Sequence, residues 1–113
     1  MRSKKITDRA FDDDTFRILD IALTFLEQYF HYTPEDAELK MNVFLKDFST
    51  RFDEDAIHHE SSYRLAAIIH YLTGLNGNPN KLGDWMVANK FNQSPPDAMD
   101  YFRRHYFEKY RQG

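Results

Sequence analysis

The architecture of this chain is set by residues 12–31, which read DDDTFRILDIALTFLEQYFH. At about 100° per residue, the apolar side chains of this stretch cover about two thirds of a helix circumference. A helix with so wide an apolar arc is buried between neighbours on more than one side. The three leading aspartates favour a helix start, because carboxylates are stabilised at the positive end of the helix dipole. We therefore predict a central helix over residues 14–31.

Signals for further helices follow toward the C-terminus. The segment TPED at residues 33–36 combines an N-cap residue, a proline at the first helical position and two acids in the first turn. The segments DED at residues 53–55 and SP at residues 94–95 are similar starts, and Gly74 is a candidate C-cap. Residues 74–80 are rich in Gly, Asn and Pro and predict a loop. The predicted helices cover residues 14–31, 34–52, 54–73, 79–91 and 95–110.

The aromatic content supports a helical core. The chain contains ten Phe, seven Tyr and one Trp, and most of them recur at helical spacing. No segment alternates apolar and polar residues over the length of a strand. At 113 residues, the chain is long enough for one domain with its own core. We predict an all-α fold, a compact bundle of four to five helices, as a single domain over residues 12–113 after a flexible N-terminal arm over residues 1–11.

The composition excludes several functional classes. The chain has no cysteine, which rules out disulfides, thiolate catalysis and Cys-ligated zinc. The absence of cysteine also fits a reducing cytoplasm, so we expect a cytoplasmic protein. A transmembrane helix needs about 20 consecutive apolar residues, and the apolar runs of this chain are far shorter. We therefore expect no membrane partner.

Charge is unevenly distributed along the chain. Residues 10–60 contain four basic and thirteen acidic residues, a net charge of −9, whereas residues 61–113 contain seven basic and four acidic residues, a net charge of +3. The acidic half disfavours the wrapping of nucleic acid by the whole surface. It suits a basic partner, or it serves solubility alone.

Neighbouring histidines raise the question of a metal site. A zinc protease needs His-Glu-x-x-His, but the string HESSY at residues 59–63 ends in tyrosine. Glu54 and His58 are four residues apart, as are Asp55 and His59, yet two such ligands hold a transition metal only weakly. We therefore expect no metal and no cofactor.

A second stripe runs along the back of the helix predicted over residues 54–73. It consists of His59, Tyr63, Ala66 and His70. His59 and His70 would lie about 16 Å apart along that helix, too far to share an ion. The stripe is either a second packing face against another helix or an exposed partner surface, where its histidines would make binding sensitive to pH.

The last predicted helix carries an aromatic residue among arginines. Phe107 is expected to point away from the core stripe, toward Arg103, Arg104 and Arg111. This composition is typical of protein-binding hot spots, and the arginines could also hold a phosphate or an acidic helix. Alternatively, Phe107 packs on the N-terminal arm or on a neighbouring subunit. The core stripe predicted for this helix is Ala98, Met99, Phe102, Tyr106 and Tyr110.

Residues 94–105 resemble part of a known DNA-binding motif. Ser94-Pro95 followed by Phe102-Arg103-Arg104-His105 is similar to the recognition-helix spacing in the helix-turn-helix half of arabinose-regulator-type transcription activators. The resemblance covers about 25 residues and implies that residues 95–111 bind DNA, with the short helix before them as the first helix of the motif. The sequence departs from the motif in two ways: residues 89–93 lack the usual small residues of the turn, and Asp97 would place a carboxylate near the phosphates.

Enzyme signatures are missing from the sequence. It contains no glycine-rich phosphate loop and no nucleophile elbow, and its carboxylates fall on predicted outer faces. We therefore expect no catalytic residue and predict a small interaction domain that binds or regulates a protein partner. In size and charge alone, it is comparable with antitoxins, toxin-immunity proteins and phage-encoded regulators. The alternative is a nucleic-acid-binding protein that uses residues 95–111.

Apolar positions outside the main core stripes also predict self-association into a homodimer. These positions are Leu39, Val43, Tyr63, Ala67 and Tyr71. The candidate partner-binding residues are Arg103, Arg104, Phe107, Arg111, His59, Tyr63 and His70.

Overall fold

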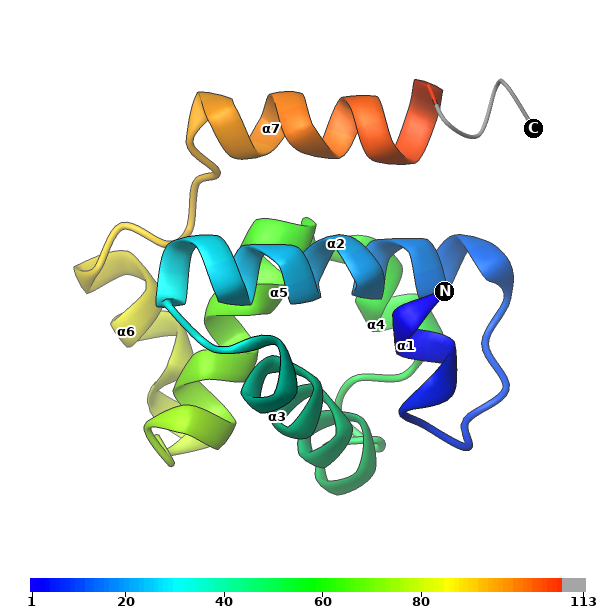
Figure 1. Ribbon diagram of the computed structural model, residues 1–113. Coiled ribbons are helices and arrows are strands. Elements are labelled where there is room, and N and C mark those ends of the chain that lie inside the picture. Colours follow the sequence, from blue (N-terminus) through cyan, green and yellow to red (C-terminus); the bar gives the residue numbers. More distant parts are fainter. Residues whose placement is uncertain (109–113) are drawn as a thin grey trace.

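The computed structural model describes residues 1–108, and these residues form helices and turns without a strand (Figure 1). The prediction of an all-α fold is therefore confirmed. The described part contains seven α-helices instead of the expected four to five, because one predicted helix is broken and the N-terminal segment is helical. The α-helices are α1 (Arg2–Lys5), α2 (Asp13–Phe30), α3 (Pro34–Asp47), α4 (Glu54–His59), α5 (Ser62–Ile69), α6 (Leu82–Ala88) and α7 (Pro96–Phe102). Two π-helical segments, η1 (His70–Gly74) and η3 (Arg103–Glu108), continue α5 and α7, and a 3-10 turn, η2 (Pro79–Lys81), precedes α6.

Helix α2 is the centre of the fold, as predicted. It contacts α1, α3, α4, α5 and η3, and nine of its 18 residues are buried. Its start is capped by Asp12, whose carboxylate accepts the Thr15 N–H at 2.8 Å. It ends at His31, which adopts a left-handed conformation with a φ of 62°.

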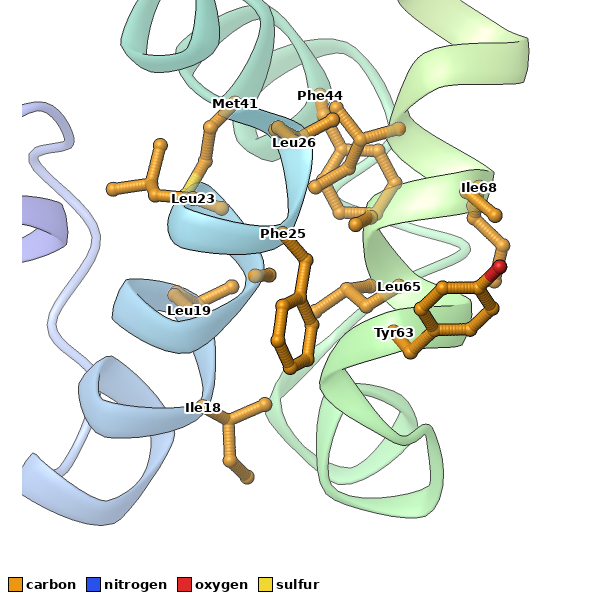
Figure 2. Close-up of a cluster of buried hydrophobic side chains, with 14 of the residues drawn as sticks. Ile18, Leu19, Leu23, Phe25, Leu26, Met41, Phe44, Tyr63, Leu65 and Ile68 are labelled. Carbon is orange, nitrogen blue, oxygen red and sulfur yellow. The ribbon is translucent and has the colours of Figure 1, made fainter. Parts of the chain in front are cut away.

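The core forms where α2, α3 and α5 meet. Figure 2 shows Leu23 and Leu26 of α2 in one cluster with Met41 and Phe44 of α3 and with Leu65 of α5. Full burial of one such side chain contributes about 1.5–3 kcal/mol, so this cluster is the main source of stability. The largest fully buried side chains are Leu19, Leu23, Phe25, Leu26, Met41, Phe44, Leu45, Ile57, Leu65, Ile68 and Ile69.

Helix α3 ends at Asp47 rather than at residue 52, where the prediction placed its end. Residues 48–52 form turns, in which the Phe52 N–H donates to the Phe48 carbonyl at 2.9 Å. The Ser and Thr at residues 49 and 50 have a lower helix propensity than Ala or Leu. The Arg9 guanidinium donates to the carbonyls of Leu45 and Phe52 at 3.3 and 3.4 Å, which provides partners for carbonyls at this helix end.

The helix predicted over residues 54–73 is broken into α4 and α5. Glu60 is extended, with a φ of −101° and a ψ of 144°, and Ser61 caps α5 by accepting the Arg64 N–H at 3.2 Å. The buried Ser62 hydroxyl donates to the Ile18 carbonyl of α2 at 2.9 Å. The local cap by Ser61 favours a new helix start at this point, and the bond from Ser62 fixes that start against α2, which together explain the break. The prediction of one continuous helix is therefore wrong.

The N-terminal segment differs from the loose arm that the sequence predicts. Residues Arg2–Lys5 form α1, which packs on α2. The backbone N–H of the buried Ser3 donates to the Asp20 carboxylate at 2.7 Å, and its hydroxyl donates to a carbonyl of α2. Arg2 forms an ion pair with Glu27 of α2 at 2.8 Å. A hydrophobic pattern cannot reveal these contacts, because they are polar.

The described C-terminal part of the chain consists of α6, a linker, and α7 with η3. Helix α6 is shorter than predicted and ends before Lys90, which has a φ of 62°. Helix α7 and η3 together cover residues 96–108, and the last two residues of the predicted helix lie outside the described residues. Figure 1 shows α7 alongside α2, on the side away from α3. None of the helices within residues 1–108 combines the length and the apolarity needed to cross a bilayer.

Candidate functional site

An open groove lies between the last helical segment, α7 with η3, and the start of α5. Its volume is about 620 Å³. The buried side chains of Phe25, Tyr63 and Ala98 form its floor. The groove is lined by residues of α2, α5, the linker before α7, and α7 with η3, so it brings together parts of the chain that are far apart in sequence.

Two apolar side chains on this groove are half exposed. Met99 of α7 is 53% exposed and Phe107 of η3 is 50% exposed, and both line the groove together with Phe102. The Phe107 ring meets those of Phe102 and Tyr106 edge-on, with centroids 6.0 and 4.8 Å apart. The sequence pattern assigns Met99 to the core. However, the apolar stripe of α7 is wider than the surface that neighbouring elements cover, so part of it remains exposed. These side chains therefore stay in contact with water unless another molecule covers them.

The π-helical segment explains the orientation of Phe107. In an α-helix, residues five apart lie about 140° from each other around the axis. A π-helix bonds residue i to residue i+5 and has a wider turn, which brings Phe102 and Phe107 to the same groove. Phe107 thus lines the groove together with Arg103. The prediction that it points away from the core stripe is therefore wrong.

The arginines of the last helical segment have different surroundings. Arg103 lines the groove. Arg104 lies outside the groove lining and pairs with Asp100 at 2.6 Å. Arg111 lies outside the described residues. The described part of the groove lining contains a second arginine, Arg64, and no carboxylate.

Hydrogen bonds stabilise the polar end of the groove, which lies next to the start of α7. This end is formed by Ser61, Arg64, Asn92 and Ser94. The Nε of Arg64 donates to the Glu60 carboxylate at 2.8 Å, and its Nη1 donates to the Asn92 carbonyl at 3.0 Å. The hydroxyl oxygens of Ser61 and Ser94 lie 3.2 Å apart. These bonds tie the linker before α7 to the start of α5 and so define the shape of the groove.

His58 links α4 to the start of α2. Its Nε2 lies 2.6 Å from the Thr15 hydroxyl and 3.7 Å from the Asp12 carboxylate. The hydrogen bonds from Thr15 lower the pKa of Asp12, and the charge of His58 adds to this effect. Glu54, the carboxylate expected beside His58, instead accepts the Asp12 N–H at 3.3 Å. Because Thr15 is fully buried, this arrangement caps a helix and does not present a nucleophile.

His59 lies at the surface, at the end of α4. Its Nδ1 is 2.8 Å from the Asp55 carbonyl oxygen and 3.9 Å from the Asp55 carboxylate, so the expected pairing is present. The bond to the Asp55 carbonyl raises the pKa of His59. Within residues 1–108, no three His, Asp or Glu side chains are grouped so that they could hold a metal ion.

Tyr63 and His70 belong to a packing face, because the break after α4 separates them from His59. Tyr63 is buried in the groove floor. His70 lies against Phe30, with 4.8 Å between the ring centroids, and its Nδ1 is 2.7 Å from the Tyr32 hydroxyl. Burial lowers the pKa of His70. The sequence allows the second stripe to be either a packing face or an exposed partner surface. In the structure, Tyr63 and His70 belong to a packing face.

The apolar positions expected to favour self-association are mostly covered. Ala67 and Tyr71 are buried, and Val43 is partly buried. Leu39 is exposed on α3, in contrast. These positions therefore do not form one large apolar patch.

No protein-family model matches the chain, and neither a curated protein nor a solved structure is significantly similar to it.

Proposed function

We propose that the chain is a non-enzymatic protein-interaction domain whose groove binds a segment of a partner protein. The observation that carries this proposal is the pair Met99 and Phe107, which are half exposed on one groove above a buried apolar floor. Concave apolar sites of this size commonly take up the side chains of a ligand or partner. A cytoplasmic location and regulation of the partner through binding are parts of the same proposal.

The energetics set a minimum size for the bound segment. Completing the burial of Met99 and Phe107 contributes roughly 1.5–3 kcal/mol in total, because each side chain is already half covered. A micromolar complex needs about 8 kcal/mol, after the cost of ordering the segment. The partner must therefore cover the whole groove, including Phe102 and the polar end, rather than insert a single side chain.

Affinity capture from a lysate of the source cells, with and without nuclease, tests this function. We expect the wild-type chain to retain a protein at a stoichiometric level after nuclease treatment, and Met99→Ser and Phe107→Ser to lose it. Leu75→Ser is the matched control, because Leu75 is also 53% exposed but lies outside the groove. Equal capture by all three variants would contradict the proposal.

Nucleic-acid binding through the last helix has less support. Arg104 is paired with Asp100 at 2.6 Å. At the N-terminus, Arg2 and Lys4 pair with carboxylates of α2, which reduces the positive field that they could add. We therefore expect the double reversal Arg103→Glu/Arg104→Glu to leave nucleic-acid affinity and its salt dependence unchanged. Affinity for a duplex DNA probe is measured at a series of salt concentrations. If it depends much less steeply on salt in the double variant than in the wild type, the result favours the nucleic-acid alternative.

A further inference from the structure

Resting on the proposed function, we infer that the partner segment is an acidic amphipathic helix, which carries carboxylates beside its bulky apolar side chains. Among the residues that the structure describes, the groove lining holds Arg64 and Arg103 and no carboxylate, although the net charge of the chain is −3. This local reversal of charge is complementary to a segment of negative charge.

Arg103 is the arginine that is available to a carboxylate of the partner. It is exposed, and it forms no ion pair with another side chain that the structure describes. Arg64, in contrast, forms an ion pair with Glu60 at 2.8 Å and donates to the Asn92 carbonyl. Its charge is therefore partly neutralised, and its main effect is on the shape of the groove. A guanidinium group binds a carboxylate through two parallel hydrogen bonds. The preference for an acidic segment therefore depends on Arg103.

The shape of the groove favours a helix as its occupant. The groove follows α7 and η3 from Ala98 to Phe107, a stretch that spans about two helical turns, so a short helix can lie along it. Met99, Phe102 and Phe107 offer successive apolar contacts along this length. A peptide bound by strand addition would need a sheet edge for its backbone, and residues 1–108 contain no strand.

A displayed library of random peptides of about 16 residues, long enough for about four helical turns, tests the inference when it is selected on the full chain. Counter-selection removes the peptides that also bind the double variant Met99→Ser/Phe107→Ser. We expect the remaining peptides to be rich in Asp and Glu and to repeat their apolar residues every three to four positions.

Two charge-reversal variants then compare the contribution of Arg103 to peptide binding with that of the neighbouring Arg104. Fluorescence anisotropy with a selected peptide should show that Arg103→Glu weakens binding about tenfold or more, because a charge-assisted pair is replaced by a repulsion. Arg104→Glu makes the same change one residue away, outside the groove lining, and should weaken binding by no more than about threefold. Circular dichroism and thermal unfolding of both variants should match the wild type.

The outcomes distinguish the inference from the proposed function. Selected peptides without an excess of acids, or equal effects of the two reversals, would overturn the acidic specificity but leave the groove as a binding site. A library without any peptide that depends on Met99 and Phe107 would overturn the proposed function as well. Concentration-dependent dimerisation that Met99→Ser and Phe107→Ser abolish, measured by sedimentation, would make a second copy of the chain the occupant and would overturn the inference.

Discussion

A side chain at Gly74 would have no space. A Cβ atom there would collide with the hydroxyl group of Tyr32 and would lie 3.1 Å from the Nδ1 of His70. The Tyr32 hydroxyl cannot move away easily, because it is hydrogen-bonded to His70 at 2.7 Å. The sequence suggests Gly74 as a left-handed C-cap, but within residues 1–108 no glycine has a positive φ. Close packing, rather than backbone freedom, therefore requires the glycine.

We expect Gly74→Ala to lower the free energy of unfolding by about 1–3 kcal/mol, as overpacking does. Gly83→Ala is the matched control, because Gly83 lies within α6 and a Cβ there would meet no atom within 4 Å. Removing a glycine from a helix should raise the free energy of unfolding by about 0.5–1 kcal/mol. Urea unfolding measures both effects, and shifts of the same sign would speak against the steric explanation.

Among the helical elements, the boundary between α4 and α5 has the greatest consequence for the groove. Ser61 caps α5, and its hydroxyl also lies 3.2 Å from that of Ser94 in the linker before α7. The start of α5 and the start of α7 therefore meet at one point. A continuous helix through residue 60 would remove the cap that holds this arrangement.

We expect Ser61→Ala to lower the free energy of unfolding by about 1 kcal/mol, the usual cost of losing an N-cap. Ser94→Ala removes only the contact between the two hydroxyls and should cost about 0.5 kcal/mol or less. Urea unfolding compares the two variants, and hydrogen exchange of the first turn of α5 localises the effect. If Ser94→Ala costs as much as Ser61→Ala, the hydroxyl pair rather than the cap stabilises this boundary.

For the whole molecule, an aromatic cluster around His70 joins the end of α2, η1, α6 and the linker that follows α6. The Phe30 ring lies 4.8 Å from that of His70 and 5.3 Å from that of Phe91, and the Trp85 ring lies 5.1 Å from that of Phe91. A charge on His70 would therefore be placed among rings from several elements. The titration of this one side chain should affect the stability of the whole fold.

We expect the free energy of unfolding to fall on acidification, and this fall to be smaller in His70→Gln. Burial lowers the pKa of His70 in the folded chain, whereas the unfolded chain has an ordinary pKa of about 6.5. The unfolded state thus binds the proton more readily, and stability that is present above about pH 6.5 is lost as the pH falls toward the folded-state pKa. Urea unfolding at a series of pH values measures this dependence.

His59→Gln provides a control of opposite sign. The pKa of His59 is raised in the folded chain, so its contribution to stability is present below the unfolded pKa and is lost as the pH rises through the folded pKa. Removing His59 should therefore make the fall on acidification slightly steeper. If both variants change the pH dependence in the same direction, the assignment to His70 is wrong.

Local patterns predict the helical class and much of the core. The stripe of α2 is buried as expected, and α3 begins at Pro34 with Thr33 as its N-cap. Part of the groove is also visible in the sequence, because Phe107 beside Arg103 stands out as an aromatic residue among arginines. Met99 is not recognised, since helical spacing assigns it to the core and cannot tell how much of the stripe a neighbouring helix will cover.

The periodicity of most helices, their N-caps and their apolar stripes follow from the amino-acid pattern alone, since they depend on residues within about four positions of one another. The break before Ser61, the packing of α1 and the groove depend on contacts across the chain. The bond from Ser62 to Ile18 joins residues 44 positions apart, and the contact between Ser61 and Ser94 joins residues 33 positions apart. Such contacts arise only when folding brings the helices together, because no local pattern specifies which neighbour a hydroxyl group or a ring will meet.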